Sequence, residues 1–300
     1  DHGQAELLAG RALSQRRTDD IGVGLAPARD RTGVDLAGEE RGDPLVLAQI
    51  RAELNLDRPL HEQYVLWLFN VLQGDLGFSW RIREPVAKVI LEKLPVTVQL
   101  GLTAFAIACL IGIPAGIVSA VRKDTPWDWA ANGFALAGIS TPNFWLGIMM
   151  ILLFSVNLGW LPPSGYVPLT VDWRQSLATT IMPAFVLGTG IAAVLMRHTR
   201  SAMVQAMAQD YVRTARAKGL AERLVVLRHA LRNALIPVVT LVGLQIGYLL
   251  GGAVVTETIF SYPGIGRLAV GAILSSDFPL AQGTILVLAL GFILVNLIVD

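Results

Sequence analysis

Five long apolar stretches fill most of this chain beyond residue 95, and none of them contains Asp, Glu, Lys, Arg or His. A helix needs about 20 apolar residues to cross the hydrocarbon core of a bilayer, and each stretch is at least that long. The sequence therefore predicts an all-α membrane protein, a polytopic helical bundle with five visible spans. These spans are Val96–Val121, Ala130–Asn157, Leu177–Met196, Leu235–Thr256 and Leu280–Val299.

Ionisable groups inside spans usually mark proton paths or voltage sensors, so spans that lack them offer neither mechanism. If the protein moves a solute uphill, we expect the energy to come from outside the spans. The composition agrees with a membrane protein, because 53% of the residues are hydrophobic and 16% are charged, against roughly 25% charged in soluble domains. Cys109 is the single cysteine, which excludes an internal disulfide.

Lysine and arginine predict the orientation, since cytoplasmic loops are enriched in both. Arg122 and Lys123 lie in one loop, and a larger set lies in the loop 197–232. Both loops are therefore expected in the cytoplasm, with 158–176 and 257–279 outside. The outer loops contain Pro-Pro and Pro-Gly turns, which predict ordered, non-helical structure. No stacking aromatics accompany the basic residues, so the sequence does not indicate nucleic-acid binding.

The front of the chain does not fit this topology. Residues 1–41 are polar and hold no apolar core for a signal peptide or an anchor. We expect them to be disordered or foreign to the fold. The topology makes 42–95 an external segment and 96–300 a transmembrane permease domain, with a cytoplasmic coupling loop over 197–234. An external segment needs a span before it, so the sequence predicts that a first span is missing.

The loop 201–234 is too long and too patterned for a simple connection. Arg213 and Arg216 fall off an apolar stripe whose members recur at helical spacing. The members of the stripe are Val204, Ala208, Tyr211 and Ala215. The sequence therefore predicts one helical face that is buried and one that is basic.

The same loop contains a predicted helix stop at Lys218-Gly219. A cation suits the negative end of a helix dipole, and glycine adopts positive φ without cost. A second segment, Glu222 to Asn233, leads into the next span, and Arg228 and Arg232 are expected to meet lipid headgroups on one face. A loop that only fixes topology would explain the charges but not this helix–glycine–helix pattern.

Small residues recur at every fourth position in two of the spans, which lets helix backbones approach closely. They are Gly112 and Gly116 in one span and Gly243, Gly247 and Gly251 in another. Plain helix packing is a better interpretation than a moving pore seam.

Polar residues in the spans are candidates for a permeation path. Asn143 and Gln245 are the best candidates for its lining, and Glu257 lies where a span reaches the outer face. There its carboxylate could meet a cationic terminus or water. Hydrogen bonding between packed helices is an equally good interpretation of the two amides.

Two segments of the long loop carry a family resemblance. They resemble the cytoplasmic signature loop of ABC importer permeases, in the version found in dipeptide and oligopeptide permeases. Arg213-Thr214-Ala215 stand at the Glu-Ala-Ala place of the broad family, so the first acid is absent, while Gly219 keeps the family's glycine. Gly42-Asp43-Pro44 and Tyr262-Pro263-Gly264-Ile265-Gly266-Arg267 resemble external parts of the same family. The two loop segments read Asp210-Tyr211-Val212-Arg213-Thr214-Ala215-Arg216-Ala217-Lys218-Gly219-Leu220 and Arg228-His229-Ala230-Leu231-Arg232-Asn233-Ala234-Leu235-Ile236-Pro237.

The resemblance implies a type I ABC importer permease in a bacterial inner membrane, usually with six spans. It implies that two related permeases enclose the path, that two cytoplasmic ATPases bind below, and that an external solute-binding protein delivers the solute. ATP and Mg²⁺ would be bound by the ATPases, and no cofactor by this chain. The residues implied to couple to an ATPase are Arg213, Thr214, Ala215, Arg216, Lys218, Gly219, Leu220 and Glu222.

Other functions stay open at this point. Sibling groups of the family carry nickel or glutathione. A secondary carrier predicts buried carboxylates or inverted repeats, and a passive channel or scaffold would use its basic loop only to bind anionic lipid. We expect a non-enzymatic transport subunit without a metal site, because the sequence has no phosphate-binding Gly-x-x-x-x-Gly-Lys-Ser/Thr and no Gly-x-Ser-x-Gly. The histidines also do not cluster at metal-ligand spacing: His2, His61, His198 and His229.

Overall fold

The computed structural model describes residues 58–79 and 81–299. They belong to two compact units, divided after Gln73, and each unit is described by itself. The first unit contributes one described helix, α3 (Leu60–Leu72). The expectations for residues 1–41 and the resemblance at Gly42-Asp43-Pro44 lie outside the described residues.

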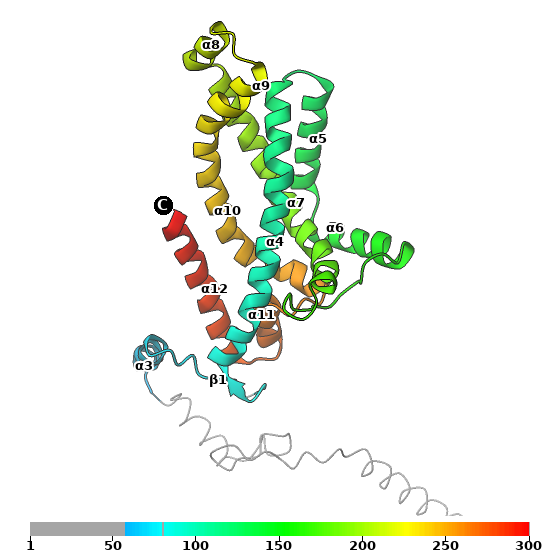
Figure 1. Ribbon diagram of the computed structural model, residues 1–300. Helices are drawn as coiled ribbons and strands as arrows, with labels where there is room; N and C mark the ends of the chain where they lie inside the picture. Colours follow the sequence, from blue (N-terminus) through cyan, green and yellow to red (C-terminus); the bar gives the residue numbers. More distant parts are fainter. Residues whose placement is uncertain (1–57, 80, 300) are drawn as a thin grey trace, which may run out of the picture. The chain divides into compact units, whose positions relative to one another are not determined.

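The second unit is a helical bundle that follows a two-stranded hairpin, as Figure 1 shows. In the hairpin, Phe78 lies opposite Pro85 and Ser79 opposite Glu84. The elements in chain order are β1 (Phe78–Ser79), β2 (Glu84–Pro85), α4 (Val86–Val121), α5 (Pro126–Ser140), α6 (Asn143–Met150), the π-helical η1 (Ile151–Asn157), α7 (Trp173–Met207), α8 (Asp210–Ala217), α9 (Glu222–Leu224), the π-helical η2 (Val225–Ala230), α10 (Leu231–Ile259), α11 (Ile265–Leu274) and α12 (Phe278–Val299). The predicted all-α membrane fold is confirmed.

Helix α4 begins at Val86, before the predicted start of its span at Val96, and it runs through Pro95 and Pro114. Its added first turns bury Val86, Val89 and Ile90 against α11 and α12. Tertiary packing of these side chains explains why a proline at position 95 does not end the helix, although proline removes one helical hydrogen bond.

The second predicted span, Ala130–Asn157, is wrong as a single helix. The chain bends by 102° between α5 and the α6–η1 segment. Thr141 leaves the helical region with ψ of 121°, because the ring of the following Pro142 disfavours the helical conformation for the residue before it. Four described helices are therefore long and apolar enough to span a membrane, or five if this bent pair counts as one span.

The contact between α4 and α7 is made by small residues. Ala104 and Ala108 of α4, together with the larger Leu100, are buried in one cluster with residues of α7. A Cβ atom added at Gly112 would lie 2.6 Å from the carbonyl oxygen of Ala192, so glycine is required where the two backbones touch. Gly116 and Gly188 sit against backbone in the same way, as expected for small residues four apart.

The second predicted glycine series lies on α10. Gly243 is buried, whereas the surroundings of Gly247 and Gly251 lie outside the described part of the chain. Helix packing through this series therefore stays a prediction.

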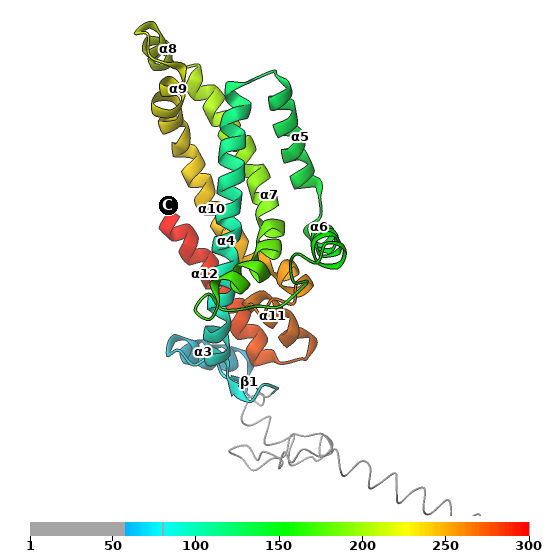
Figure 2. The same cartoon turned by 45° about the vertical axis from the view of Figure 1, so that its right-hand side comes forward.

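The two basic loops lie at one end of the bundle, as predicted. Helices α8 and α9 and the α4–α5 connection are at the top of Figures 1 and 2, whereas the hairpin and α11 are at the bottom. By the enrichment of cytoplasmic loops in Lys and Arg, the end with α8 is the cytoplasmic one. The outer loop 257–279 is not wholly non-helical as expected, because α11 forms within it and buries Ile265, Ala269 and Ala272.

Replacing Gly112 by alanine tests the α4–α7 contact. The added methyl would overlap backbone that cannot rotate away, so Gly112→Ala should destabilise the protein by about 1–3 kcal/mol. Gly101→Ala is the matched control in the same helix, since nothing lies within 4 Å of the added atom. There the loss of unfolded-chain freedom should stabilise by about 0.4–1 kcal/mol. Thermal unfolding of the purified protein in detergent measures both, and equal midpoints would contradict the contact.

Candidate coupling loop

The long cytoplasmic loop begins with a break between α7 and α8. Gln209 takes an extended conformation with φ of −77° and ψ of 151°, and α8 starts at the next residue. This break changes the register, so the predicted stripe through Val204, Ala208, Tyr211 and Ala215 is wrong as one continuous face. Tyr211 is 38% exposed and Val212 is fully buried. The buried face consists of Met203, Ala206, Val212 and Ala215.

The predicted helix stop at Lys218-Gly219 is confirmed. Lys218 is the C-cap of α8, and Gly219 follows with φ of +76°. The amide of Gly219 donates to the carbonyl of Arg216 (2.9 Å), and that of Leu220 to the carbonyl of Ala215 (3.4 Å). This pair of bonds is a Schellman motif, which satisfies helix-end carbonyls and favours glycine at the left-handed position.

A charged pair bridges the turn that Gly219 makes. The Arg216 guanidinium donates to both carboxylate oxygens of Glu222, at 2.6 and 3.1 Å. Since these side chains are 41% and 54% exposed, the pair contributes little stability. It orients the two segments instead, because a bidentate Arg–carboxylate contact fixes geometry. The Glu222 carboxylate also raises the pKa of the Arg216 guanidinium.

The inner face of α8 joins the loop to the transmembrane helices. Val212 and Ala215 pack in one cluster with Ala120 at the end of α4, Met203 of α7 and Val225 of η2. Leu220, just after the Gly219 turn, packs against the same cluster. The loop is therefore a packed structure in which α8 shares one buried cluster with the ends of α4, α7 and α10.

The structure sorts the predicted coupling residues into two groups. Ala215 is buried and Leu220 is half-buried, so these two hold the loop together. The others form an exposed surface, here called the outer face of α8: Arg213, Thr214, Arg216, Lys218, Gly219 and Glu222. The predicted lipid-facing residues Arg228 and Arg232 are also exposed. The outer face of α8 carries more positive than negative charge, and no described element covers it.

A buried ion pair beside this loop was missed by the sequence reasoning. Asp128 of α5 is buried, and both its oxygens accept from the Arg200 guanidinium of α7 at 2.8 Å. The Ser119 hydroxyl of α4 and the Asn132 amide also donate to this carboxylate. The sequence places Arg200 only within the basic loop 197–232. The available signal was Asp128 itself, an acid in the first turn of a helix that opens with Pro126.

The lining role of two predicted path residues stays a prediction. Asn143, at the start of α6, and Gln245 of α10 are half-buried. Neither amide forms a side-chain hydrogen bond with another residue in the described part of the chain. By contrast Gln99 of α4 donates to Ser176 and Thr180 of α7 and accepts from Tyr166, so its amide joins packed helices.

Glu257 does not lie in the open position expected for a path residue. It is fully buried near the end of α10. Thr97 of α4 donates to one carboxylate oxygen and the backbone amide of Arg267 to the other, each at 2.8 Å. The carboxylate therefore occupies the N-terminus of α11, where free amides and the helix dipole favour an anion. A Cβ atom at Gly264 would lie 2.0 Å from this carboxylate, which explains the glycine there.

Comparison with known proteins supports the transport assignment of this architecture. Residues 112–300 match the family described as binding-protein-dependent transport system inner membrane component. The chain is 44% identical over 288 residues to the dipeptide transport system permease protein DppB of Escherichia coli (strain K12), which covers 88% of this chain and 85% of that protein. It is 45% identical over 285 residues to the di/tripeptide transport system permease protein DppB of Pseudomonas aeruginosa (strain UCBPP-PA14), with the same coverage.

Solved structures share the fold at low identity. An inward-facing structure of the MetNI methionine ABC transporter matches with a TM-score of 0.59 and 16% identity, over 71% of this chain and 93% of that chain. An amino acid ABC transporter with histidines matches with a TM-score of 0.52 and 15% identity, over 71% and 89%. The bundle described above is thus the fold of type I importer permeases.

Removing Arg200 tests the missed ion pair. Arg200→Met leaves the Asp128 carboxylate buried without its counter-charge, whereas Asp128→Asn with Arg200→Met removes both charges. We expect a coupling free energy of about 1–3 kcal/mol, so that the double variant is more stable than the two single losses predict. Denaturant unfolding of the four proteins measures it, and additive losses would contradict the pair. Lys88→Met, which breaks an exposed pair with Glu84, should barely change stability.

Proposed function

The chain belongs to the family of binding-protein-dependent transport system inner membrane components, and on this premise we propose that it forms part of a peptide path and receives the work of ATP hydrolysis at α8 and the Gly219 turn. It is a multi-pass inner-membrane permease subunit of an ABC importer. The observation that carries the peptide assignment is the identity of 44–45% to dipeptide and di/tripeptide permeases over 88% of the chain.

The geometry of α8 supports a mechanical input. A helix of eight residues is closed by a Schellman turn and fixed to the next segment by the Arg216–Glu222 pair. Its outer face is polar and exposed, so a cytoplasmic protein can bind there. Its inner face is apolar and packed, so binding and release on the outside must act on the spans. Coupling between two sites requires such an element that both can bias.

The force would pass from α8 to three helices at once. The cluster beneath α8 contains residues from α4, α7 and η2, and η2 continues directly into α10. The Asp128–Arg200 pair ties α5 to α7 at the same end. In the proposed cycle, closure of the ATPases moves α8, and these helices move with it as one body between inward-open and outward-open states.

Partners follow from the class of the protein. A permease of an ABC importer works with ATPase subunits and with a protein that binds the solute. We propose the complete assembly as two related permeases, two cytoplasmic ATPases that hold ATP and Mg²⁺, and one external solute-binding protein. The chain itself would bind no cofactor and perform no hydrolysis.

Substituting Gly219 tests the coupling role. Gly219→Val places a β-branched residue at φ of +76°, which costs about 1–2 kcal/mol. This strain lowers the population of the Schellman turn roughly 5–30-fold. No atom lies within 4 Å of the added Cβ, so the effect is on the backbone and not on packing. Gly219→Asn is the matched control, since asparagine tolerates this conformation.

In proteoliposomes that contain the full transporter, Gly219→Val should reduce ATP-driven peptide uptake far more than it reduces assembly with the ATPases. Gly219→Asn should retain most of the uptake. Normal uptake in the valine variant, or equal loss in both variants, would contradict coupling through this turn.

Uptake competition tests the substrate class. With the solute-binding protein outside and ATP on the ATPase side, a labelled dipeptide should accumulate against its gradient. Excess unlabelled di- or tripeptide should remove most of the signal, while Ni²⁺ should not. Competition by glutathione but not by ordinary dipeptides would assign the chain to a sibling group. Accumulation that follows a proton gradient without ATP would contradict the importer assignment itself.

A further inference from the structure

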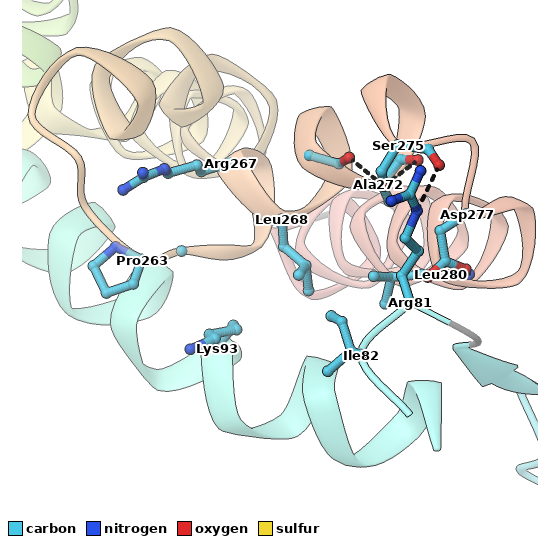
Figure 3. Close-up of a pocket in the computed structure, with 12 residues that line it drawn as sticks. Arg81, Ile82, Lys93, Pro263, Arg267, Leu268, Ala272, Ser275, Asp277 and Leu280 are labelled. Atoms are coloured by element: carbon cyan, nitrogen blue, oxygen red, sulfur yellow. Dashed lines mark hydrogen bonds between the residues drawn. The ribbon is translucent and has the colours of Figure 1, made fainter. Parts of the chain in front are cut away.

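A cavity of about 340 Å³ lies at the end of the bundle opposite to α8. The hairpin turn, α4, α11 and the start of α12 surround it, as Figure 3 shows. Three of its lining residues are cations from three separate segments: Arg81, Lys93 and Arg267. In Figure 3, Lys93 and Arg267 lie toward one side of the cavity and Arg81 toward the other.

None of these three cations forms an ion pair with a described carboxylate. Arg81 donates through Nε to the carbonyl of Ser275 at 3.2 Å, which leaves most of its guanidinium donors unused. The one acid that lines the cavity, Asp277, is buried and already engaged, because it accepts from the Ser79 hydroxyl and from the amide of Leu280. Three cations against this one carboxylate leave the cavity with a net positive charge.

Lys93 is the most shielded of the three cations. Its side chain is half-buried on α4, whereas Arg81 and Arg267 are exposed. Cations are also uncommon at the external end of membrane proteins, yet three gather around one cavity here. An anionic ligand would neutralise this charge. A phosphate group fits these cations, since arginine offers a planar fork to its oxygens and lysine a point charge.

Apolar surface next to the cations indicates which class of phosphate-containing ligand fits the cavity. Ile82, Leu268 and Leu280 form walls of the cavity, so its interior is not a simple ion site. Nearby, Leu274 at the end of α11 is 82% exposed and Phe278 at the start of α12 is 70% exposed. A ligand with a phosphate at one end and an acyl chain at the other fits both features. The volume is at the lower end of the usual range for small-ligand pockets, about 300–1,000 Å³.

We propose that this cavity binds the phosphodiester headgroup of an anionic phospholipid from the external leaflet. Lys93 and Arg267 hold the phosphate oxygens from one side of the cavity and Arg81 contacts the headgroup from the other, and the acyl chains leave along the exposed apolar residues of α11 and α12. The bound lipid lies against α11, whose N-terminus is fixed by Glu257, and so stabilises the external end of the bundle. This site lies at the end of the bundle opposite to the coupling loop.

Native mass spectrometry of the full transporter in detergent tests the proposal. The complex is titrated with short-chain phosphatidylglycerol and, separately, with short-chain phosphatidylcholine. The wild-type complex should retain phosphatidylglycerol in preference to phosphatidylcholine. Combined Arg81→Gln, Lys93→Gln and Arg267→Gln should weaken phosphatidylglycerol binding at least tenfold. The Arg267 substitution leaves the contact to Glu257 in place, because the backbone amide makes it.

Arg174→Gln is the matched control, since Arg174 is a cation of the outer segments that stacks on Trp173 and does not line the cavity. It should leave phosphatidylglycerol binding unchanged, and an equal loss there would overturn the site. Displacement of the lipid by millimolar inorganic phosphate would assign the cavity to a free anion and overturn the lipid proposal. Arg81→Gln alone changes an exposed side chain and should still weaken binding, which keeps the test valid if the triple variant unfolds. Unchanged binding in a folded triple variant would also refute the proposal.

Discussion

Backbone contact between α4 and α7 sets the geometry of the whole bundle. At Gly112, Gly116 and Gly188 the two helices approach so closely that no side chain fits between them. In a bilayer this contact cannot rely on the hydrophobic effect, because lipid is as apolar as the helix surface, so close packing and interhelical hydrogen bonds supply the stabilisation. Two polar contacts join other helices to α4 and α7. The Asp128–Arg200 ion pair joins α5 to α7 at the cytoplasmic end, and the Thr97–Glu257 hydrogen bond joins α10 to α4 at the external end.

The absence of ionisable residues from the predicted spans led to the expectation that energy enters from outside, and Glu257 refines that argument. A buried carboxylate is the feature expected of a secondary carrier. Here it has a structural use, because Thr97 and the first amides of α11 occupy its oxygens and Gly264 leaves no room for a larger residue. A carboxylate committed to a helix terminus is poorly placed to take up and release ions. The packed coupling loop is the better candidate for energy input.

Sequence reasoning succeeded where a local rule decides the structure. The Lys218-Gly219 stop, the apolar spans and the exposed outer face of α8 follow from propensity, hydropathy and charge. It failed where the structure depends on the path of the chain or on contacts between residues far apart in sequence. Hydropathy measures the length of an apolar segment but not its path, so it does not predict the 102° bend after Ser140. Pro142 is the local signal for that bend. Likewise, whether Tyr211 or Val212 is buried depends on the break at Gln209, and the Asp128–Arg200 pair joins residues far apart in sequence.

The cytoplasmic and external ends of the bundle differ in how their charged groups are arranged, and this difference bears on mechanism. At the cytoplasmic end the buried Asp128 carboxylate has four donor groups and α8 is closed by its Schellman turn. Packed interiors transmit a displacement because they cannot deform continuously. A stiff cytoplasmic end therefore suits the receipt of force. At the external end, Glu257 fixes the N-terminus of α11, while Arg81, Lys93 and Arg267 form no ion pair with a carboxylate in the described part of the chain. The proposed lipid would therefore add a second contact beside α11.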